Sequence, residues 1–400
     1  MEMAAPVNAD KPSWNPLRCG GTGLPTHLVA LAKVLILCEL WTNQVAGLPD
    51  RFLPFLPLFE HLGPPEVFQR TLQALFLVAS FGVLFNRRVQ ASCLLFGLVI
   101  VTAMLSSRTH FGNNRFYVGC LLFLIGLYTP KFGPRLIQLQ VVILYFGAAL
   151  NKILLPDWWS GQFFENWVKV LDQQTFMRAA AWLPPLMLSK LAGWFTMAAE
   201  SALAVGLLVR RWNPWAIWLG IFLYAGMLWF TGSTFTLFFY AGIAAFLAFV
   251  DWPKPPLTVL YDGDCGFCEK TKNLFARFDL EGTFEWVPFQ KARNLHGIST
   301  DALKERLHFV AKGKIYAGYR AFKMMLLYNP LFYLVVTVIL LAPGRGDSAF
   351  RSWFTAAMIL LFFPLFNPLG EWLYMRVAGN RHRIVPGSAC NVEAAPPARH

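Results

Sequence analysis

Long apolar segments constrain this chain more than any other feature of its sequence. A helix that crosses a membrane needs about 20 mostly apolar residues. About eight windows before residue 251 meet this requirement, with the boundaries 27–46, 69–86, 90–107, 115–129, 136–152, 186–209, 214–231 and 233–250. We therefore predict a polytopic α-helical membrane bundle of about eight spans.

The composition supports this interpretation and argues against nucleic acid as a partner. Only 14% of the residues are charged, whereas a soluble domain carries about 25%, so the lipid bilayer must solvate much of the surface. The 35 basic and 22 acidic residues leave a net charge of +13, which Lys and Arg in short cytoplasmic loops explain. No basic stretch interleaved with aromatic residues resembles a nucleic-acid groove.

The basic loops also predict an orientation. If the N-terminus is cytoplasmic, the basic residues that border the spans lie on one side of the membrane, as the positive-inside rule requires. These residues are Lys11, Arg18, Arg87, Arg88, Lys131, Arg135, Arg210 and Arg211. We expect a bacterial-type inner-membrane protein whose chain returns to the cytoplasm at residue 251. A count that differed by one span would place the part of the chain after residue 251 on the opposite side of the membrane.

The residue pattern of the sequence changes after a Pro-rich linker at 251–256. An apolar run at 257–261 predicts a strand, followed by a tight turn, a helix over 265–278, a strand at 283–287 and a hairpin formed by 306–310 and 314–317. This order of elements is typical of a thioredoxin-like α/β domain. Two further apolar stretches, 325–342 and 353–369, form either a membrane hairpin, which would make ten spans, or helices that lie against the bilayer.

The chain therefore divides into five predicted parts. They are an N-terminal cytoplasmic segment (1–25), a transmembrane domain (26–250), a linker (251–256), an α/β domain with a hydrophobic insertion near 325–369 (257–391) and a tail (392–400).

The strongest chemical signal is the pair Cys265 and Cys268, two residues apart at the predicted helix start. The unpaired N–H groups of a helix N-terminus stabilise a thiolate there. We therefore predict that Cys265 is the nucleophile and that Cys268, one turn inside, is the resolving thiol. Asp262 and Asp264 oppose ionisation of the thiols as accessory acids, or Asp264 caps the helix.

A structural zinc site is the alternative interpretation of the same pair. Zinc sites are commonly built from Cys and His ligands, and His382 and Cys390 near the C-terminus could complete a site with Cys265 and Cys268. We favour redox chemistry, since one CxxC that follows a strand at a helix start fits the order of elements better. No bound metal or cofactor is predicted for the α/β domain.

The segment 258–268 (TVLYDGDCGFC) resembles the signature of the DCC thiol–disulfide oxidoreductase family. The segments 286–290 (WVPFQ) and 373–383 (LYMRVAGNRHR), with Cys390, are also similar to that family, so the resemblance covers about 256–391. It implies a thioredoxin-like fold and dithiol chemistry at Cys265 and Cys268. The apolar stretch at 353–366 looks like an insertion, and no proline precedes the third strand, which puts thioredoxin-type substrate docking in doubt.

Charged residues inside apolar spans are the next candidates, because Lys near a helix centre costs about 3 kcal/mol to insert. Lys33 and Glu39 both fall in the first window, but six residues turn a helix by about 600°, so the two point to different faces. Glu200 lies in the sixth window. Such a residue either faces a functional cavity or braces the bundle.

The segment 142–161 (VILYFGAALNKILLPDWWSG) resembles the horizontally transferred transmembrane family, relatives of vitamin-K-dependent γ-carboxylase, over about 24–250. The resemblance implies that Lys152 is a base in the membrane site, although it could instead reach to the interface as lysines at helix ends do. At 113–117 (NNRFY) Arg115 stands where the carboxylase has a histidine. We therefore expect no carboxylation, and keep a quinone-type or lipid ligand in the bundle as a hypothesis.

Together these features predict a membrane-bound thiol–disulfide oxidoreductase that acts on a protein or small-molecule disulfide. The second hypothesis is a quinone- or lipid-binding membrane protein whose C-terminal domain regulates it or binds zinc.

Overall fold

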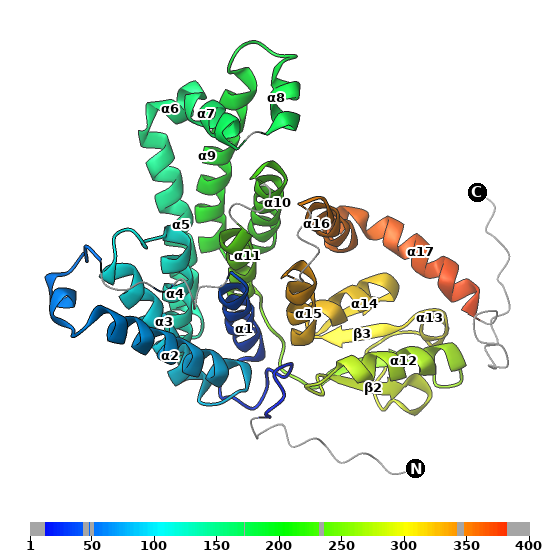
Figure 1. Cartoon of the computed structure of the whole chain (residues 1–400). Coiled ribbons are helices and arrows are strands. Elements are labelled where there is room, and N and C mark those ends of the chain that lie inside the picture. The colour runs from blue at the N-terminus through cyan, green and yellow to red at the C-terminus, as the bar shows by residue number, and fades with distance from the viewer. Residues whose placement is uncertain are drawn as a thin grey trace.

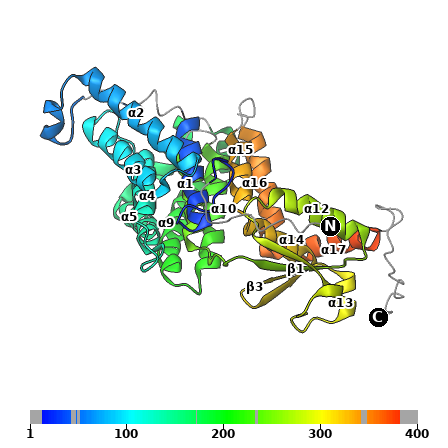
Figure 2. The same ribbon diagram turned by 90° about the horizontal axis from the view of Figure 1, so that it is seen from below.

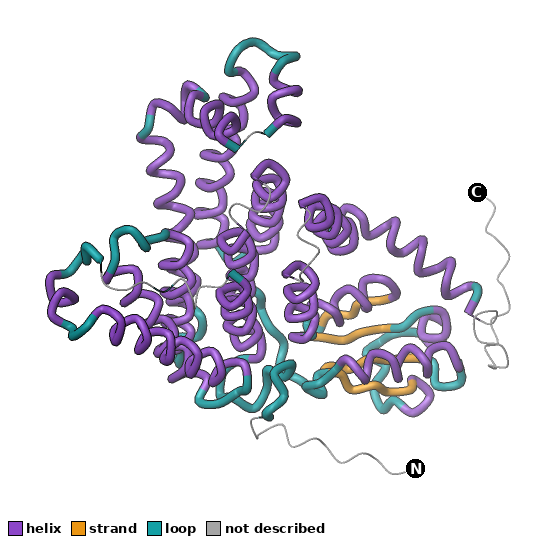
Figure 3. The backbone as a smooth tube through the Cα atoms, viewed as in Figure 1, coloured by secondary structure: helices purple, strands orange, loops and turns teal. Residues whose placement is uncertain are grey.

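The computed structural model describes residues 13–42, 48, 52–171, 173–231, 236–341 and 348–381. A bundle of helices and a smaller α/β region lie side by side (Figure 1). Helices dominate, and the strands are confined to the C-terminal part of the chain (Figure 3).

The N-terminal part, up to residue 249, is helical. Its elements are α1 (Thr26–Trp41), η1 (Pro57–His61), α2 (Pro65–Leu84), α3 (Val89–Ser106), α4 (Asn113–Gly126), α5 (Arg135–Leu154), α6 (Pro156–Ser160), α7 (Gln162–Val170), α8 (Gln174–Ala180), α9 (Met187–Leu208), α10 (Asn213–Thr231), α11 (Thr236–Ala245) and η2 (Phe246–Phe249).

Among the described residues, four helices, α2, α3, α5 and α9, are long and apolar enough to cross a membrane. Two bent pairs, described below, raise this number to six if each pair counts as one span. The expected count of about eight spans is therefore not confirmed. Helix α1 has 16 residues and α4 has 14, so at about 1.5 Å per residue both are shorter than a hydrocarbon core of about 30 Å.

Small residues allow the bundle helices α3 and α4 to pack closely. A Cβ atom built on Gly97 would lie 2.7 Å from the backbone oxygen of Gly119, and one built on Gly126 would lie 2.8 Å from the backbone oxygen of Gln90. Glycines at such contacts let helix backbones approach in a membrane, where packing drives association. A larger side chain at Gly97 would separate the two helices.

The C-terminal part contains four strands and the remaining helices. The strands are β1 (Leu257–Tyr261), β2 (Phe284–Pro288), β3 (His308–Ala311) and β4 (Lys314–Ala317); the helical elements are α12 (Gly266–Phe278), η3 (Phe289–Lys291), α13 (Thr300–Glu305), α14 (Gly318–Leu327), α15 (Pro330–Leu341), α16 (Ser348–Phe362), η4 (Pro364–Phe366) and α17 (Asn367–Gly379). Each strand and helix predicted between residues 257 and 317 is present, within about three residues of the expected limits.

The sheet has the order β2-β1-β3-β4, with β1 parallel to β2 and antiparallel to β3. Side chains of a strand alternate between the two faces. Val259 and Phe309 therefore share one core with Phe275 of α12 and Met325 of α14, whereas Leu260 packs on the other face with Leu303 of α13. This arrangement places α12, and the turn before it, at the end of β1.

The two apolar stretches after the sheet form bent helix pairs. The axis turns by 77° between α14 and α15 and by 65° between α16 and α17. Both breaks fall at prolines, Pro330 and Pro364, which interrupt helical hydrogen bonding. Helices α15 and α16 pack against α1 and α10, so they lie between the bundle and the sheet (Figures 1 and 2).

Polar contacts also join the two halves. The carboxylate of Glu281 accepts hydrogen bonds from the N–H groups of Cys19 and Gly20, the second at 2.9 Å. Lys312, in the turn between β3 and β4, forms an ion pair with Asp251. The segment before α1 and the segment before β1 are therefore both attached to the α/β region.

Candidate active site

The cysteine pair lies where β1 passes into α12. Cys265 is the residue before the first helical residue and has extended dihedral angles, φ −91° and ψ 110°. Its carbonyl accepts the first helical hydrogen bond, from the N–H of Glu269 at 3.0 Å. The structure therefore confirms that the pair stands at a helix start, with Cys268 in the first turn.

Asp262 and Asp264 hold the turn and do not cap the helix. The side-chain amide of Gln290 donates to Asp262 Oδ1 at 2.7 Å and to Asp264 Oδ2 at 3.1 Å. Its oxygen accepts from the N–H of Gly263 at 3.1 Å. The expectation that Asp264 is the N-cap is wrong, because Cys265 occupies that position and the Asp264 carboxylate turns towards Gln290.

The two thiols differ in exposure. Cys265 is fully buried, whereas Cys268 is half-buried. A hydrogen bond with Cys265, together with burial, raises the pKa of the Cys268 thiol well above its usual range. Cys268 therefore keeps its proton at neutral pH.

Arg381 is a basic residue beside Cys268 that we did not single out from the sequence. The two residues line the same small cavity, of about 30 Å³, together with Tyr374 of α17. The positive charge of Arg381 opposes the rise in the pKa of Cys268. Arg381 is buried, and its Nη2 donates to the backbone oxygen of Lys304 at 2.9 Å. Its only sequence signal was its place in the segment 373–383.

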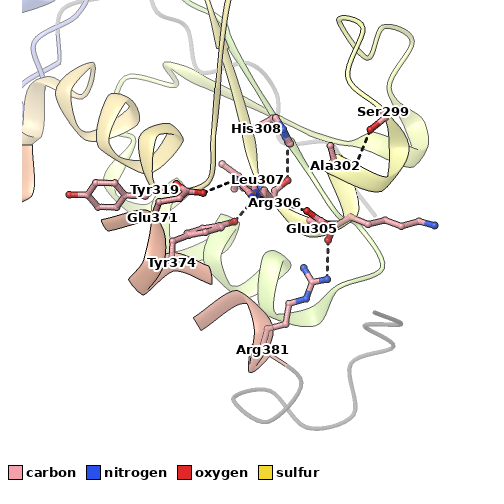
Figure 4. Close-up of polar contacts among 11 residues, drawn as sticks. Ser299, Ala302, Glu305, Arg306, Leu307, His308, Tyr319, Glu371, Tyr374 and Arg381 are labelled. Atoms are coloured by element: carbon pink, nitrogen blue, oxygen red, sulfur yellow. Dashed lines mark hydrogen bonds and ion pairs between the residues drawn. The ribbon is translucent and has the colours of Figure 1, made fainter. Parts of the chain in front are cut away.

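Polar contacts attach helix α17 to the residues that precede β3 and to helix α14 (Figure 4). Glu371 forms an ion pair with Arg306 at 2.9 Å and accepts from the N–H of Tyr319 at 3.2 Å. The N–H of Leu307 donates to the hydroxyl oxygen of Tyr374 at 3.1 Å. These contacts hold α17 against the side of the domain on which Cys268 is accessible.

Loosening α17 is expected to make the cysteine pair more reactive. In the double variant Glu371→Gln, Tyr374→Phe the alkylation rate of Cys268 by iodoacetamide should rise about five- to thirtyfold, because each of the lost hydrogen bonds stabilises the closed state by about 1 kcal/mol. Peptide mass spectrometry of the full-length protein measures this rate. Lys169→Gln, which removes an exposed ion pair with Glu165, is the matched control. An unchanged rate in the double variant would show that α17 does not limit access.

The zinc alternative remains outside what the structure describes. His382 and Cys390 lie beyond the last described residue, 381. Among the described residues, no group of three or more His, Cys, Asp or Glu side chains could hold a metal ion.

A second cluster lies in the bundle, between α5 and α9. Lys152 Nζ and a carboxylate oxygen of Glu200 are 2.8 Å apart, and their side chains are 16% and 7% exposed. Both line a cavity of about 1180 Å³, which Asn113, Asn114 and Trp158 also line. The structure therefore brings Lys152 and Glu200 together.

Arg115 does not join this pair. It is not among the described residues that line the cavity. Its guanidinium lies against the imidazole of His110, with nitrogen atoms 3.3 Å apart. Lys33 and Glu39 also do not meet. Lys33 Nζ donates to the backbone oxygen of Pro16 at 2.7 Å, and neither carboxylate oxygen of Glu39 has a hydrogen-bond partner among the described residues.

A buried strand that leads into a helix with a cysteine pair at its start is an arrangement of thiol–disulfide oxidoreductases. Residues 259–354 match the family model described as DCC1-like thiol–disulfide oxidoreductase. The match covers about a quarter of the chain, includes the cysteine pair and ends within α16. It supports a thiol–disulfide oxidoreductase function in general terms. No curated protein and no solved structure matches the chain significantly.

Proposed function

We propose that this protein is a membrane-bound thiol–disulfide oxidoreductase that uses Cys265 and Cys268 as its redox dithiol. The observation that carries the proposal is the hydrogen-bonded cysteine pair at the start of α12, inside the matched region. The order of the elements, with the sheet arranged β2-β1-β3-β4, supports a thioredoxin-like fold for the domain that begins at residue 257.

The proposed cycle transfers two electrons to a substrate disulfide. The Cys265 thiolate attacks one substrate sulfur, the substrate S–S bond breaks, and the first substrate thiolate leaves. Cys268 then loses its proton and attacks the Cys265 sulfur, which breaks the mixed disulfide and releases the second thiolate. The products are a reduced substrate and a Cys265–Cys268 disulfide, which a dithiol donor must reduce again.

The burial of Cys265 adds a requirement to this cycle. A fully buried sulfur cannot meet a protein disulfide, so the domain must open before the first attack. Helix α17 is the element we propose to move, because it covers the side of the domain next to Cys268 and is attached to Arg306 and Leu307 by polar contacts. Local opening of this kind occurs in the least stable parts of a fold.

Trapping of a mixed disulfide tests which cysteine is the nucleophile and which is the resolving thiol. A Cys268→Ser variant should accumulate a mixed disulfide on Cys265, because the resolving thiol is absent. Non-reducing electrophoresis followed by peptide mass spectrometry detects the adduct, and Cys265→Ser is the matched variant that should trap little. Trapping in Cys265→Ser but not in Cys268→Ser would reverse the roles and make the more exposed Cys268 the nucleophile.

We further propose that the protein resides in a bacterial-type inner membrane, with a 26–250 transmembrane domain of about eight spans and the redox domain in the cytoplasm. The candidate spans α2, α3, α5 and α9 support a membrane domain within 26–250, and the basic loops support its orientation. The cytosol keeps thiols reduced, so the pair would work there as a reductant or relay. Labelling by a membrane-impermeant maleimide in intact cells would place the pair on the outer side.

A second candidate function rests on the bundle cavity with the Lys152–Glu200 pair. Its mostly apolar lining suits a quinone-type or lipid ligand, and the resemblance to carboxylase relatives makes Lys152 the candidate base. In this alternative the C-terminal domain only regulates the bundle or binds zinc. Retained function in a Cys265→Ser, Cys268→Ser variant would favour it.

A further inference from the structure

A separate cavity of about 370 Å³ lies between the bundle and the two helices that follow the sheet. Helices α10, α11, α15 and α16 form its walls. The side chains that line it are mostly apolar, among them Ile217, Ile221, Val336, Leu340, Met358 and Ile359. Its volume falls within the range of small-molecule sites, roughly 300–1,000 Å³.

One polar group that lines this cavity is Tyr240 of α11. The side chain is 6% exposed, and its hydroxyl has no hydrogen-bond partner among the described residues. A buried hydroxyl without a partner costs about 1–3 kcal/mol. Tyr240 is therefore a donor that a ligand could satisfy.

Arg351 of α16 stands at the same end of the cavity. Phe354 and Thr355, one turn further along α16, line the cavity, as do residues at the next two turns, so a helical repeat puts Arg351 on the same face. The guanidinium of Arg351 interacts electrostatically with the Tyr240 hydroxyl. Arg351 is 8% exposed, and its Nε has no partner within the described part of the chain.

The opposite end of the cavity has no such unmet donor. Lys323, which approaches there beside Phe362, donates to the backbone oxygen of Phe362 at 3.2 Å and to the side chain of Asn367. The positive charge that lacks a partner is thus at the Arg351 end alone, among the described residues at the two ends.

We propose that this cavity binds one long-chain fatty acid, with its carboxylate on Arg351 and Tyr240 and its chain along α10 and α15. A buried guanidinium needs an anionic partner, and a carboxylate matches its planar fork with two hydrogen bonds. The apolar walls suit a single hydrocarbon chain, and about 370 Å³ is near the lower limit for ligand sites, which favours one chain over the two chains of a phospholipid. The site does not involve the cysteine pair.

Equilibrium binding of radiolabelled palmitate to the full-length protein in detergent tests the proposal. Unlabelled palmitate should displace the probe, whereas hexadecanol, with the same chain and no charge, and phosphatidylglycerol should displace it only at much higher concentration. Arg351→Gln should weaken binding about tenfold or more, and Tyr240→Phe about two- to tenfold. Arg210→Gln, at a guanidinium that is 84% exposed, is the matched control and should bind as the wild type does.

Thr355→Trp fills the cavity without changing its charge and should abolish binding, so the proposal can be tested even if Arg351→Gln fails to fold. Binding by Thr355→Trp or Arg351→Gln within twofold of the wild type would overturn the proposal. Hexadecanol that competes as well as palmitate would show that charge plays no part. Phosphatidylglycerol that competes better than palmitate would assign the site to membrane phospholipid instead.

Discussion

Serine at either Cys265 or Cys268 is expected to abolish catalytic disulfide reduction, with a loss of at least about a thousandfold in turnover, because residues that act as one chemical unit fail together. The assay is reduction of an insulin disulfide by the full-length protein, with a dithiol donor supplied in excess. Both single variants should fall to nearly the same residual rate, since the cycle needs both sulfurs.

Cys93→Ser is the matched control for these variants. Cys93 is a fully buried cysteine in α3, far along the chain from the matched region. It should keep wild-type turnover. If Cys93→Ser lost as much activity as Cys265→Ser, or if the double variant Cys265→Ser, Cys268→Ser stayed active, the redox assignment would be wrong.

Removal of one partner of the Lys152–Glu200 ion pair is expected to destabilise the bundle by about 3–5 kcal/mol, because the remaining charge would be buried without compensation. Lys152→Met and Glu200→Gln should each show this loss in thermal unfolding of the detergent-solubilised protein. The double variant Lys152→Met, Glu200→Leu should recover most of it, since well-packed apolar side chains can replace a buried pair.

The exposed pair of Lys169 and Glu165 provides the control, and Lys169→Met should change stability by less than about 1 kcal/mol. Equal losses at Lys152 and Lys169 would contradict the description of Lys152–Glu200 as a buried pair. A double variant that is stable yet unable to bind a quinone or lipid would show that the pair serves the bundle cavity and does more than brace α5 against α9.

The local structure around the cysteine pair followed from the sequence because short-range rules govern it. An apolar run before Asp262 and Gly263 predicted β1 and its turn, and the two runs 306–310 and 314–317 predicted the hairpin. Each of these signals lies within a few residues of the element that it predicts.

The walls of the site could not be predicted in this way. Arg381 and Tyr374 reach Cys268 from more than 100 residues later in the sequence, and no local pattern encodes such a contact. The partnership of Lys152 with Glu200 likewise depends on how α5 and α9 pack.

The number of spans was the weakest expectation, since hydropathy windows measure composition and not helix length. The window at 115–129 is mostly apolar, but α4 ends at Gly126 after 14 residues. Prolines bend the two apolar stretches that follow the sheet. At Pro330 and Pro364 they turn the apolar stretches by 77° and 65°, so neither forms a straight span.

The central claim is that Cys265 and Cys268 exchange two electrons reversibly as a pair. Equilibration of the full-length protein in buffers of graded dithiol-to-disulfide ratio, followed by alkylation and mass spectrometry of the peptide that carries both residues, measures this directly. The claim predicts one two-electron transition, in which both sulfurs become protected from alkylation together and recover together. Two sulfurs that stay alkylatable at every ratio, or that stoichiometric zinc protects until a chelator is added, would contradict it.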